Sequence, residues 1–119
     1  MLQILSLKTQ DTANKTTKVV ALTGELDESN LEALQVELNP ILDDTSISNL
    51  ILDFSKLEFI NSKGIGFLVS IHTHLSRDKR SLFMASAQAA VMDVITLVGL
   101  TSIIPYFPTV EAATASLES

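Results

Sequence analysis

The residue best placed for chemistry in this sequence is Ser62. It follows a near-continuous apolar run over residues 49–54, typical of a strand covered on both faces, and then a short polar stretch. Residues 62–77 repeat apolar side chains at helical spacing, so Ser62 is predicted to lie at the start of a helix. Its hydroxyl could cap that helix, which is worth about 1 kcal/mol. It could also carry a phosphate, whose charge of about −1.5 to −2 would suit the positive helix end. From the residues alone, the cap is favoured.

The two histidines offer little catalytic potential. His72 and His74 lie two positions apart on one predicted helix, so their rings face different directions and cannot bind the same metal ion. His72 falls on the apolar side and is expected to be partly buried, whereas His74 is expected to be exposed. The chain has no cysteine, which excludes disulfides, thiol catalysis and cysteine-bound metals. We therefore expect a protein that is not an enzyme, with no catalytic residues, metal site or cofactor.

Acidic residues follow two of the predicted strands. Glu25, Asp27 and Glu28 come after the second strand, and Asp53 ends the third. The ends of parallel strands share one edge of a sheet, so these acids could form a metal-binding or partner-binding rim near Ser62. Alternatively, Asp27 leads or caps the first helix and Glu28 complements its dipole. The helix interpretation is favoured for Glu28, and both interpretations stay open for Asp27 and Asp53.

Asp53 also raises the alternative of a receiver domain of two-component signalling, whose phosphorylated aspartate follows its third strand. A receiver needs an acidic pair after its first strand and a lysine after its last. Here the acids follow a second strand, and residues 103–106 contain no lysine. The receiver interpretation is therefore disfavoured.

Two glycines, Gly64 and Gly66, fall in the first turn of the second predicted helix. They lack the longer glycine pattern of a phosphate-binding loop. Glycine inside a helix costs roughly 1 kcal/mol relative to alanine. Their presence therefore indicates that something approaches this turn closely, either a neighbouring strand or a partner protein.

The elements that must position these residues alternate between strand and helix. Strands are predicted at residues 2–7, 18–24, 49–54 and 81–85 and from residue 103, with the first two forming an antiparallel pair. Helices are predicted after residues 29, 62, 88 and 109. The alternation indicates an α/β fold with a mixed, mostly parallel sheet of four to five strands and about four helices packed on it.

Local signals set the predicted boundaries of these helices. Ser29 and Glu32 have the spacing of a capping box for the first helix, and Asn39 before Pro40 is expected to bend or end it. Gly99 should turn left-handed after the third helix, and Thr109 should cap the fourth.

Composition limits the remaining possibilities. The chain has 119 residues, of which 46% are hydrophobic and 18% charged, so we expect one globular domain over residues 1–119. The net charge of −6 disfavours binding to nucleic acid or to anionic membranes. Apolar runs are too short for membrane insertion, and the chain begins with no secretion signal. A cytoplasmic location is expected.

Two motifs in this chain resemble the signature of STAS domains, the family of bacterial anti-sigma factor antagonists. In that family an apolar strand ends in Asp, and Asp-Ser-Ser-Gly with an apolar residue follows. Gly-x-Leu/Ile-Asp ends the second strand. The matching residues here are Asp53 with Asn61-Ser62-Lys63-Gly64-Ile65-Gly66, and Gly24-Glu25-Leu26-Asp27. The element order also fits, so the resemblance covers essentially the whole chain and implies the STAS fold.

The resemblance implies a function in transcription control. The chain would bind an anti-sigma factor that is also a serine-protein kinase, and would thereby free the sigma factor. Ser62 would be the phosphorylated serine; the phosphorylated form lets the anti-sigma factor go, and a phosphatase resets it. The implied partner-binding face consists of Gly24, Glu25, Leu26 and Asp27 with Asn61, Ser62, Lys63, Gly64 and Ile65.

Two positions depart from the family pattern. Asn61 stands where the family usually has Asp, and Lys63 where it often has a second Ser. Asn can still turn the backbone and cap a helix, but it removes a charge beside Ser62. Lys63 adds a cation that could pair with a phosphate. STAS domains also include small cytoplasmic subunits of lipid-transport ABC complexes and scaffolds that are not phosphorylated, and these are the alternative functions.

Overall fold

The computed structural model describes residues 6–11 and 16–118. The elements in chain order are β1 (Ser6–Asp11), β2 (Thr17–Leu26), α1 (Leu31–Leu42), β3 (Asn49–Ile60), α2 (Ser62–Arg77), β4 (Ser81–Ala85), α3 (Ala89–Leu97), the 3-10 helix η1 (Leu100–Ser102), β5 (Tyr106–Phe107) and α4 (Val110–Glu118). This confirms the alternation predicted from the sequence.

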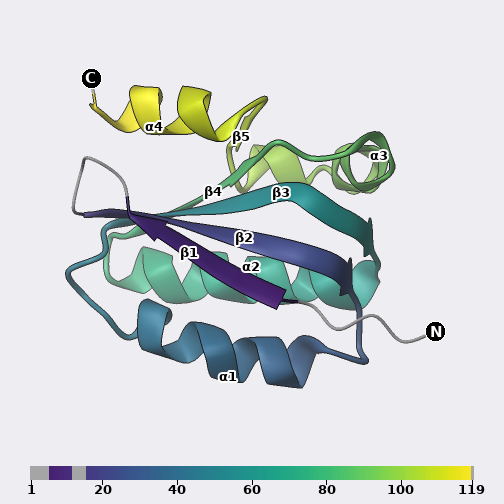
Figure 1. Cartoon of the computed structure of the whole chain (residues 1–119), viewed down its shortest axis with the longest axis horizontal. Helices are drawn as coiled ribbons and strands as arrows, with labels where there is room; N and C mark the ends of the chain where they lie inside the picture. The colour runs from purple at the N-terminus through teal and green to yellow at the C-terminus, as the bar shows by residue number, and fades with distance from the viewer. Residues whose placement is uncertain (1–5, 12–15, 119) are drawn as a thin grey trace.

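The strands form one sheet in the order β1-β2-β3-β4-β5 (Figure 1). β1 runs antiparallel to β2, as predicted, whereas β2, β3, β4 and β5 are parallel to one another. Helices α1 and α2 lie on one side of the sheet and α4 on the other (Figure 1). The C-terminal ends of β2 and β3 meet at one edge of the sheet, and α2 begins there.

The apolar run in β3 is explained by helices on both faces of the sheet. Leu50 and Leu52 lie in the main core, together with buried residues of α1 and α2. Ile51 points the other way, into a second apolar cluster with Ala113 of α4. All three β3 residues are almost fully buried, as expected for a central strand covered on both sides.

β3 is longer than the sequence predicts. It continues past Phe54 to Ile60 where a polar loop was expected, and it stays paired with β2 as far as Leu26. The pairing register shifts between Ala21 and Thr23, so the strand contains an irregularity. Beyond it, the buried residues Phe54, Leu57 and Ile60 recur every third position. That spacing differs from the two-residue period of a regular strand, which is why the pattern resembled a loop.

Two other boundaries also differ from the predictions. α1 continues through Asn39 to Leu42, with Pro40 inside its last turn, so the helix does not end at Asn39. The last strand is β5, because residues 103–104 follow η1 instead of starting a strand. β1 begins at Ser6, and residues 2–5 of the predicted first strand lie outside the described residues. Gly99 does adopt a left-handed conformation, and the Thr109 hydroxyl oxygen accepts the Ala112 N–H at 3.0 Å, as predicted.

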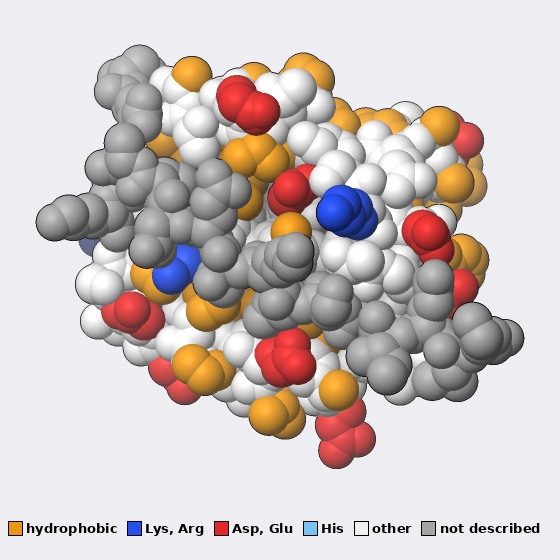
Figure 2. All heavy atoms as spheres, viewed as in Figure 1, with side chains coloured by type: hydrophobic (Ala, Val, Ile, Leu, Met, Phe, Trp, Pro, Cys, Tyr) orange, Lys and Arg blue, Asp and Glu red, His pale blue; other side chains and the backbone are white. Residues whose placement is uncertain are grey.

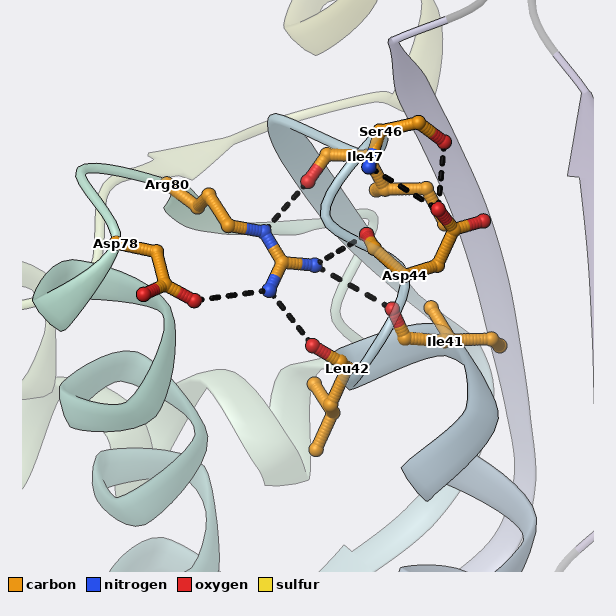
Figure 3. A network of polar contacts seen from close by, with 7 residues as sticks. All are labelled: Ile41, Leu42, Asp44, Ser46, Ile47, Asp78 and Arg80. Carbon is orange, nitrogen blue, oxygen red and sulfur yellow. Dashed lines mark hydrogen bonds and ion pairs between the residues drawn. The ribbon is translucent and has the colours of Figure 1, made fainter.

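A buried arginine organises the edge of the sheet where β3 and β4 begin (Figure 3). Arg80 is only 6% exposed, and Asp78 lies 3.6 Å from it. Its guanidinium donates to the backbone oxygens of Leu42 (2.6 Å), Ile47 (2.7 Å), Asp44 (2.9 Å) and Ile41 (3.4 Å). The last carbonyls of a helix lack partners within the helix, and a cation suits that negative end. Arg80 thus fixes the C-terminus of α1 and the loop that follows it.

Acidic side chains are spread over the molecular face seen in Figure 2, in keeping with the net charge of −6. None of the helices in the described parts of the chain is long and apolar enough to cross a membrane. Within residues 6–11 and 16–118, no group of three or more His, Asp or Glu side chains is arranged to hold a metal ion.

Candidate functional site

The two motifs singled out in the sequence meet at the C-terminal edge of the parallel strands. Leu26 at the end of β2 pairs with Ile60 at the end of β3. The N–H of Asn61 then donates to the Leu26 carbonyl at 3.3 Å, immediately before α2 begins at Ser62. The sheet register therefore joins the two motifs at Leu26, while Gly24 and Glu25 lie opposite Leu57 and Phe59 of β3.

Asn61, and not Ser62, is the N-cap of α2. Asn61 has an extended backbone, and its Oδ1 accepts the Gly64 N–H at 3.1 Å. The prediction that Ser62 caps the helix is therefore wrong. Asn caps a helix at least as well as Ser, and here it comes one residue earlier. Ser62 occupies the first helical position instead; its side chain is exposed and forms no hydrogen bond with any residue that the structure describes.

Glu28 is held at the same helix start. The Asn61 Nδ2 donates to Glu28 Oε2 at 2.6 Å, joining the loop between β2 and α1 to the N-terminus of α2. This hydrogen bond is the main reason that the pKa of Glu28 lies below its ordinary value, and the Lys63 cation lowers the pKa further. This bond adds a role at the start of α2, and the interpretation of Glu28 as a partner for the dipole of the first helix stays a prediction.

The loop between β2 and α1 is tied together by Asn30, which is 8% exposed. Its Oδ1 accepts the Asp27 N–H at 3.2 Å, and its Nδ2 donates to the Glu25 carbonyl. Asn30 occupies the N-cap position of α1 without a side-chain cap bond. Ser29 instead donates its N–H and its hydroxyl to the Asp27 carboxylate. The predicted capping box is therefore absent, and Asp27 stabilises the loop itself rather than α1.

Asp53 is not brought to the strand end. It lies in the middle of β3, where it pairs with Ala85 of β4. Its Oδ1 accepts the Ser55 N–H at 2.9 Å, beside the irregular part of the strand. Its carboxylate therefore has a local role in this structure, and no acidic rim that includes it forms around Ser62.

The two glycines of α2 have different surroundings. A Cβ atom on Gly64 would lie 2.6 Å from the Leu26 carbonyl oxygen and 2.8 Å from the Cγ1 of Ile60. Gly64 thus allows α2 to approach the ends of β2 and β3, which matches the neighbouring-strand interpretation. A Cβ atom on Gly66 would meet nothing within 4 Å. Gly66 is therefore not explained by a close approach within the described residues.

The remaining side chains differ in exposure. Lys63 is exposed and Ile65 is partly buried against the core. Phe59, the last-but-one residue of β3, is 46% exposed, which is unusual for a large aromatic side chain. Gly24 has a φ of 109°, which favours glycine at this position of β2. Chemically, the site offers an accessible hydroxyl at the positive end of a helix, with a cation and a carboxylate close by.

Sequence reasoning missed two features of this edge: the role of Asn30 in the loop, and the hydrogen bond between Asn61 and Glu28. The Asn61 cap had a signal, since Asn is a strong N-cap residue. The partners of the two asparagine side chains had no comparable signal, because they depend on how β2 and β3 are paired.

Comparisons with known proteins decide the family. The family model described as the STAS domain matches residues 7–113. The chain belongs to the STAS domain family. A curated relative is BtrV of Bordetella bronchiseptica, whose name assigns it provisionally to the anti-sigma factor antagonists. This STAS domain is 26% identical to it over 101 residues, which cover 85% of this chain and 86% of BtrV.

Solved structures agree with this STAS fold. An anti-sigma factor antagonist from Mycobacterium paratuberculosis superposes with a TM-score of 0.85 at 23% identity, over 97% of this chain and 95% of that one. The unphosphorylated form of SpoIIAA gives a TM-score of 0.77 at 20% identity, over 95% and 96%. The phosphorylated form of this Bacillus protein gives 0.70 at 20% identity, over 94% and 99%. At these identities the likeness establishes the fold alone.

Proposed function

We propose that this STAS domain, taken as one unit over residues 1–119, is an anti-sigma factor antagonist that is switched off by phosphorylation at Ser62. The observation that carries the proposal is the exposed Ser62 hydroxyl, which is free of hydrogen bonds to the described residues because Asn61 caps the helix. A kinase can therefore reach this hydroxyl without breaking a bond of the fold. The names of the relatives support the same class of function.

The proposed partner-binding face is formed by the segment from Gly24 to Asp27 and the segment from Asn61 to Ile65. Gly24, Leu26 and Gly64 are buried in it, so the other side chains would make the contacts. Leu26 connects the two segments, because it pairs with Ile60 and its carbonyl accepts the Asn61 N–H. A partner docked here would cover Ser62, so a phosphate on Ser62 would have to be desolvated in the complex. That cost falls on the complex and not on the free protein, where water and the positive end of α2 stabilise the charge.

The proposal assigns no catalysis to this chain. An anti-sigma factor that is also a serine-protein kinase supplies the phosphate, and a separate phosphatase removes it. The net charge of −6 argues against nucleic acid as a direct partner. Such a system operates in the cytoplasm, where ATP and the sigma factor are found.

Phosphate mapping tests this function. The protein is incubated with ATP and its cognate serine kinase, and the modified residue is located by mass spectrometry. Phosphate is expected on Ser62, and Ser62→Ala should abolish the phosphorylation. Ser70→Ala is a matched control on the same helix, because Ser70 is also exposed but donates its hydroxyl to the Phe67 carbonyl at 2.6 Å.

Two results would overturn the proposed switch. One is phosphate elsewhere than on Ser62, and the other is partner binding that is indifferent to Ser62→Asp. Co-purification of an ATPase subunit without a kinase would instead indicate the subunit of a lipid-transport ABC complex.

A further inference from the structure

We propose that Asn61 links the phosphorylation state of Ser62 to the loop between β2 and α1, by holding Glu28 in the unmodified protein and releasing it when Ser62 carries a phosphate. The inference rests on the proposed function, because it concerns how the same serine would control the same binding face. It concerns Glu28, which lies outside both family motifs.

The geometry makes Asn61 the junction of this edge. Its backbone N–H bonds to the Leu26 carbonyl at the end of β2, and its Oδ1 caps α2 through the Gly64 N–H. Its Nδ2 bonds to Glu28 at 2.6 Å. An amide can accept the cap bond with its oxygen and donate to a carboxylate with its nitrogen, whereas an ionised carboxylate can only accept. Aspartate at position 61 would keep the cap but would place a second carboxylate against Glu28.

The charges around this bond make it sensitive to a phosphate. Glu28 keeps its negative charge at neutral pH, stabilised by Asn61 and more weakly by Lys63, and opposed by Asp27. A phosphate on Ser62 would stand on the residue between Asn61 and Lys63, bringing a charge of about −1.5 to −2. It would repel the Glu28 carboxylate, attract the Lys63 ammonium and compete for the Asn61 amide. All three effects weaken the Asn61–Glu28 bond.

The part of the loop that responds is defined by its other bonds. Asn30 is buried and bonds to Glu25 and Asp27 inside the loop, so these contacts do not depend on Asn61. Phosphorylation would instead weaken the hydrogen bond between Asn61 and the exposed Glu28. The outer surface of the loop would then change. Phosphorylation would then alter both segments of the proposed binding face, although only one of them is modified.

The test places phosphoserine at position 62 by genetic encoding, so that no kinase or partner is needed. NMR follows the exchange rate of the Asn61 side-chain amide protons and the titration of the Glu28 carboxyl. On phosphorylation, the amide protons should exchange about two- to tenfold faster, as expected for loss of one hydrogen bond. The pKa of Glu28 should rise.

Three variants make the test specific. Glu28→Gln keeps an acceptor for Asn61 without the charge, so phosphoserine should speed the Asn61 amide exchange clearly less than it does in the parent protein. Asn61→Asp should raise the Glu28 pKa even without phosphate. Glu32→Gln removes an exposed charge from the first turn of α1 and should respond to phosphoserine as the parent protein does.

The coupling would be overturned if phosphoserine left both the Asn61 amide exchange and the Glu28 titration unchanged, or if Glu28→Gln responded to phosphoserine as strongly as the parent protein. Failure of the unmodified protein to bind any anti-sigma factor would overturn the proposed function. That result would leave the NMR outcome intact, so the two failures are distinguishable.

Discussion

The two edges of the parallel sheet are each organised by one polar side chain that bonds to several neighbours. At the N-terminal edge, Arg80 is almost fully buried and bonds to four backbone carbonyls, which do not titrate. At the C-terminal edge, Asn61 is half-buried and bonds to an exposed carboxylate, which can move and change its charge. The first edge is built for stability. The second holds the features that a phosphate could alter.

The largest expected effect on stability is at the N-terminal edge of the sheet, where Arg80 lies. Arg80→Ala removes a buried cation and leaves the carbonyls at the end of α1 without their donors. We expect the free energy of unfolding, measured by urea denaturation, to fall by about 3 kcal/mol or more. Arg77→Ala removes an exposed cation nearby and should change stability by less than about 0.5 kcal/mol. A loss below about 1 kcal/mol for Arg80→Ala would mean that this edge is not fixed by the arginine.

The second effect separates the two glycines of α2. Gly64→Ala would force a Cβ against the backbone of β2, so we expect a loss of about 1–3 kcal/mol in the same unfolding experiment. Gly66→Ala meets open space within a helix and should gain up to about 1 kcal/mol. Equal effects of the two substitutions would contradict the close approach of α2 to β2.

A smaller effect distinguishes the cap from the proposed phosphorylation site. Asn61→Ala should cost about 1 kcal/mol of stability, because it removes the N-cap of α2. Ser62→Ala should be close to neutral, since its exposed hydroxyl bonds to none of the described residues. Thermal unfolding of the two variants side by side measures the difference. A larger loss of stability for Ser62→Ala than for Asn61→Ala would mean that Ser62, and not Asn61, caps α2.

The smallest expected effect is a change in how stability depends on pH, through one carboxylate at each edge of the sheet. The pKa of Glu28 is lowered mainly by Asn61, and that of Asp44 mainly by the Ser46 side chain. A carboxyl whose pKa is lowered by folding stabilises the protein above its unfolded pKa, and this contribution is lost as the pH falls through the folded value. Glu28→Gln and Asp44→Asn should therefore each reduce the loss of stability between neutral pH and acid. Because both carboxylates are exposed, added salt should reduce this difference. A steeper loss of stability toward acid in either variant would contradict the assigned hydrogen bonds.

Much of the fold could be predicted from the sequence, because it depends on local patterns. The apolar run at residues 49–54, the helical spacing after Ser62 and the left-handed Gly99 all act within a few residues of chain. The length of β3 could not be predicted, because its buried residues recur every third position past an irregularity. A register shift of this kind depends on the neighbouring strand.

In the candidate site, too, features set by local sequence could be predicted and those set by tertiary contacts could not. The two motifs predicted which segments come together, because strand ends meet at one edge of a parallel sheet. Which asparagine or serine side chain bonds to which neighbour depends on tertiary geometry. The role of Arg80 was missed for a related reason. Its partners are backbone carbonyls, which every residue has, so no residue type indicates them.

We propose that the Ser62 hydroxyl, at the C-terminal edge of the sheet, controls partner binding. The most direct measurement is calorimetric titration of the cognate anti-sigma factor kinase into the unmodified protein and into protein carrying phosphoserine at position 62. We expect the unmodified form to bind, and the phosphorylated form to bind roughly tenfold or more weakly, because the buried dianion loses its water. Equal affinity for the two forms, or no binding by either, would contradict it.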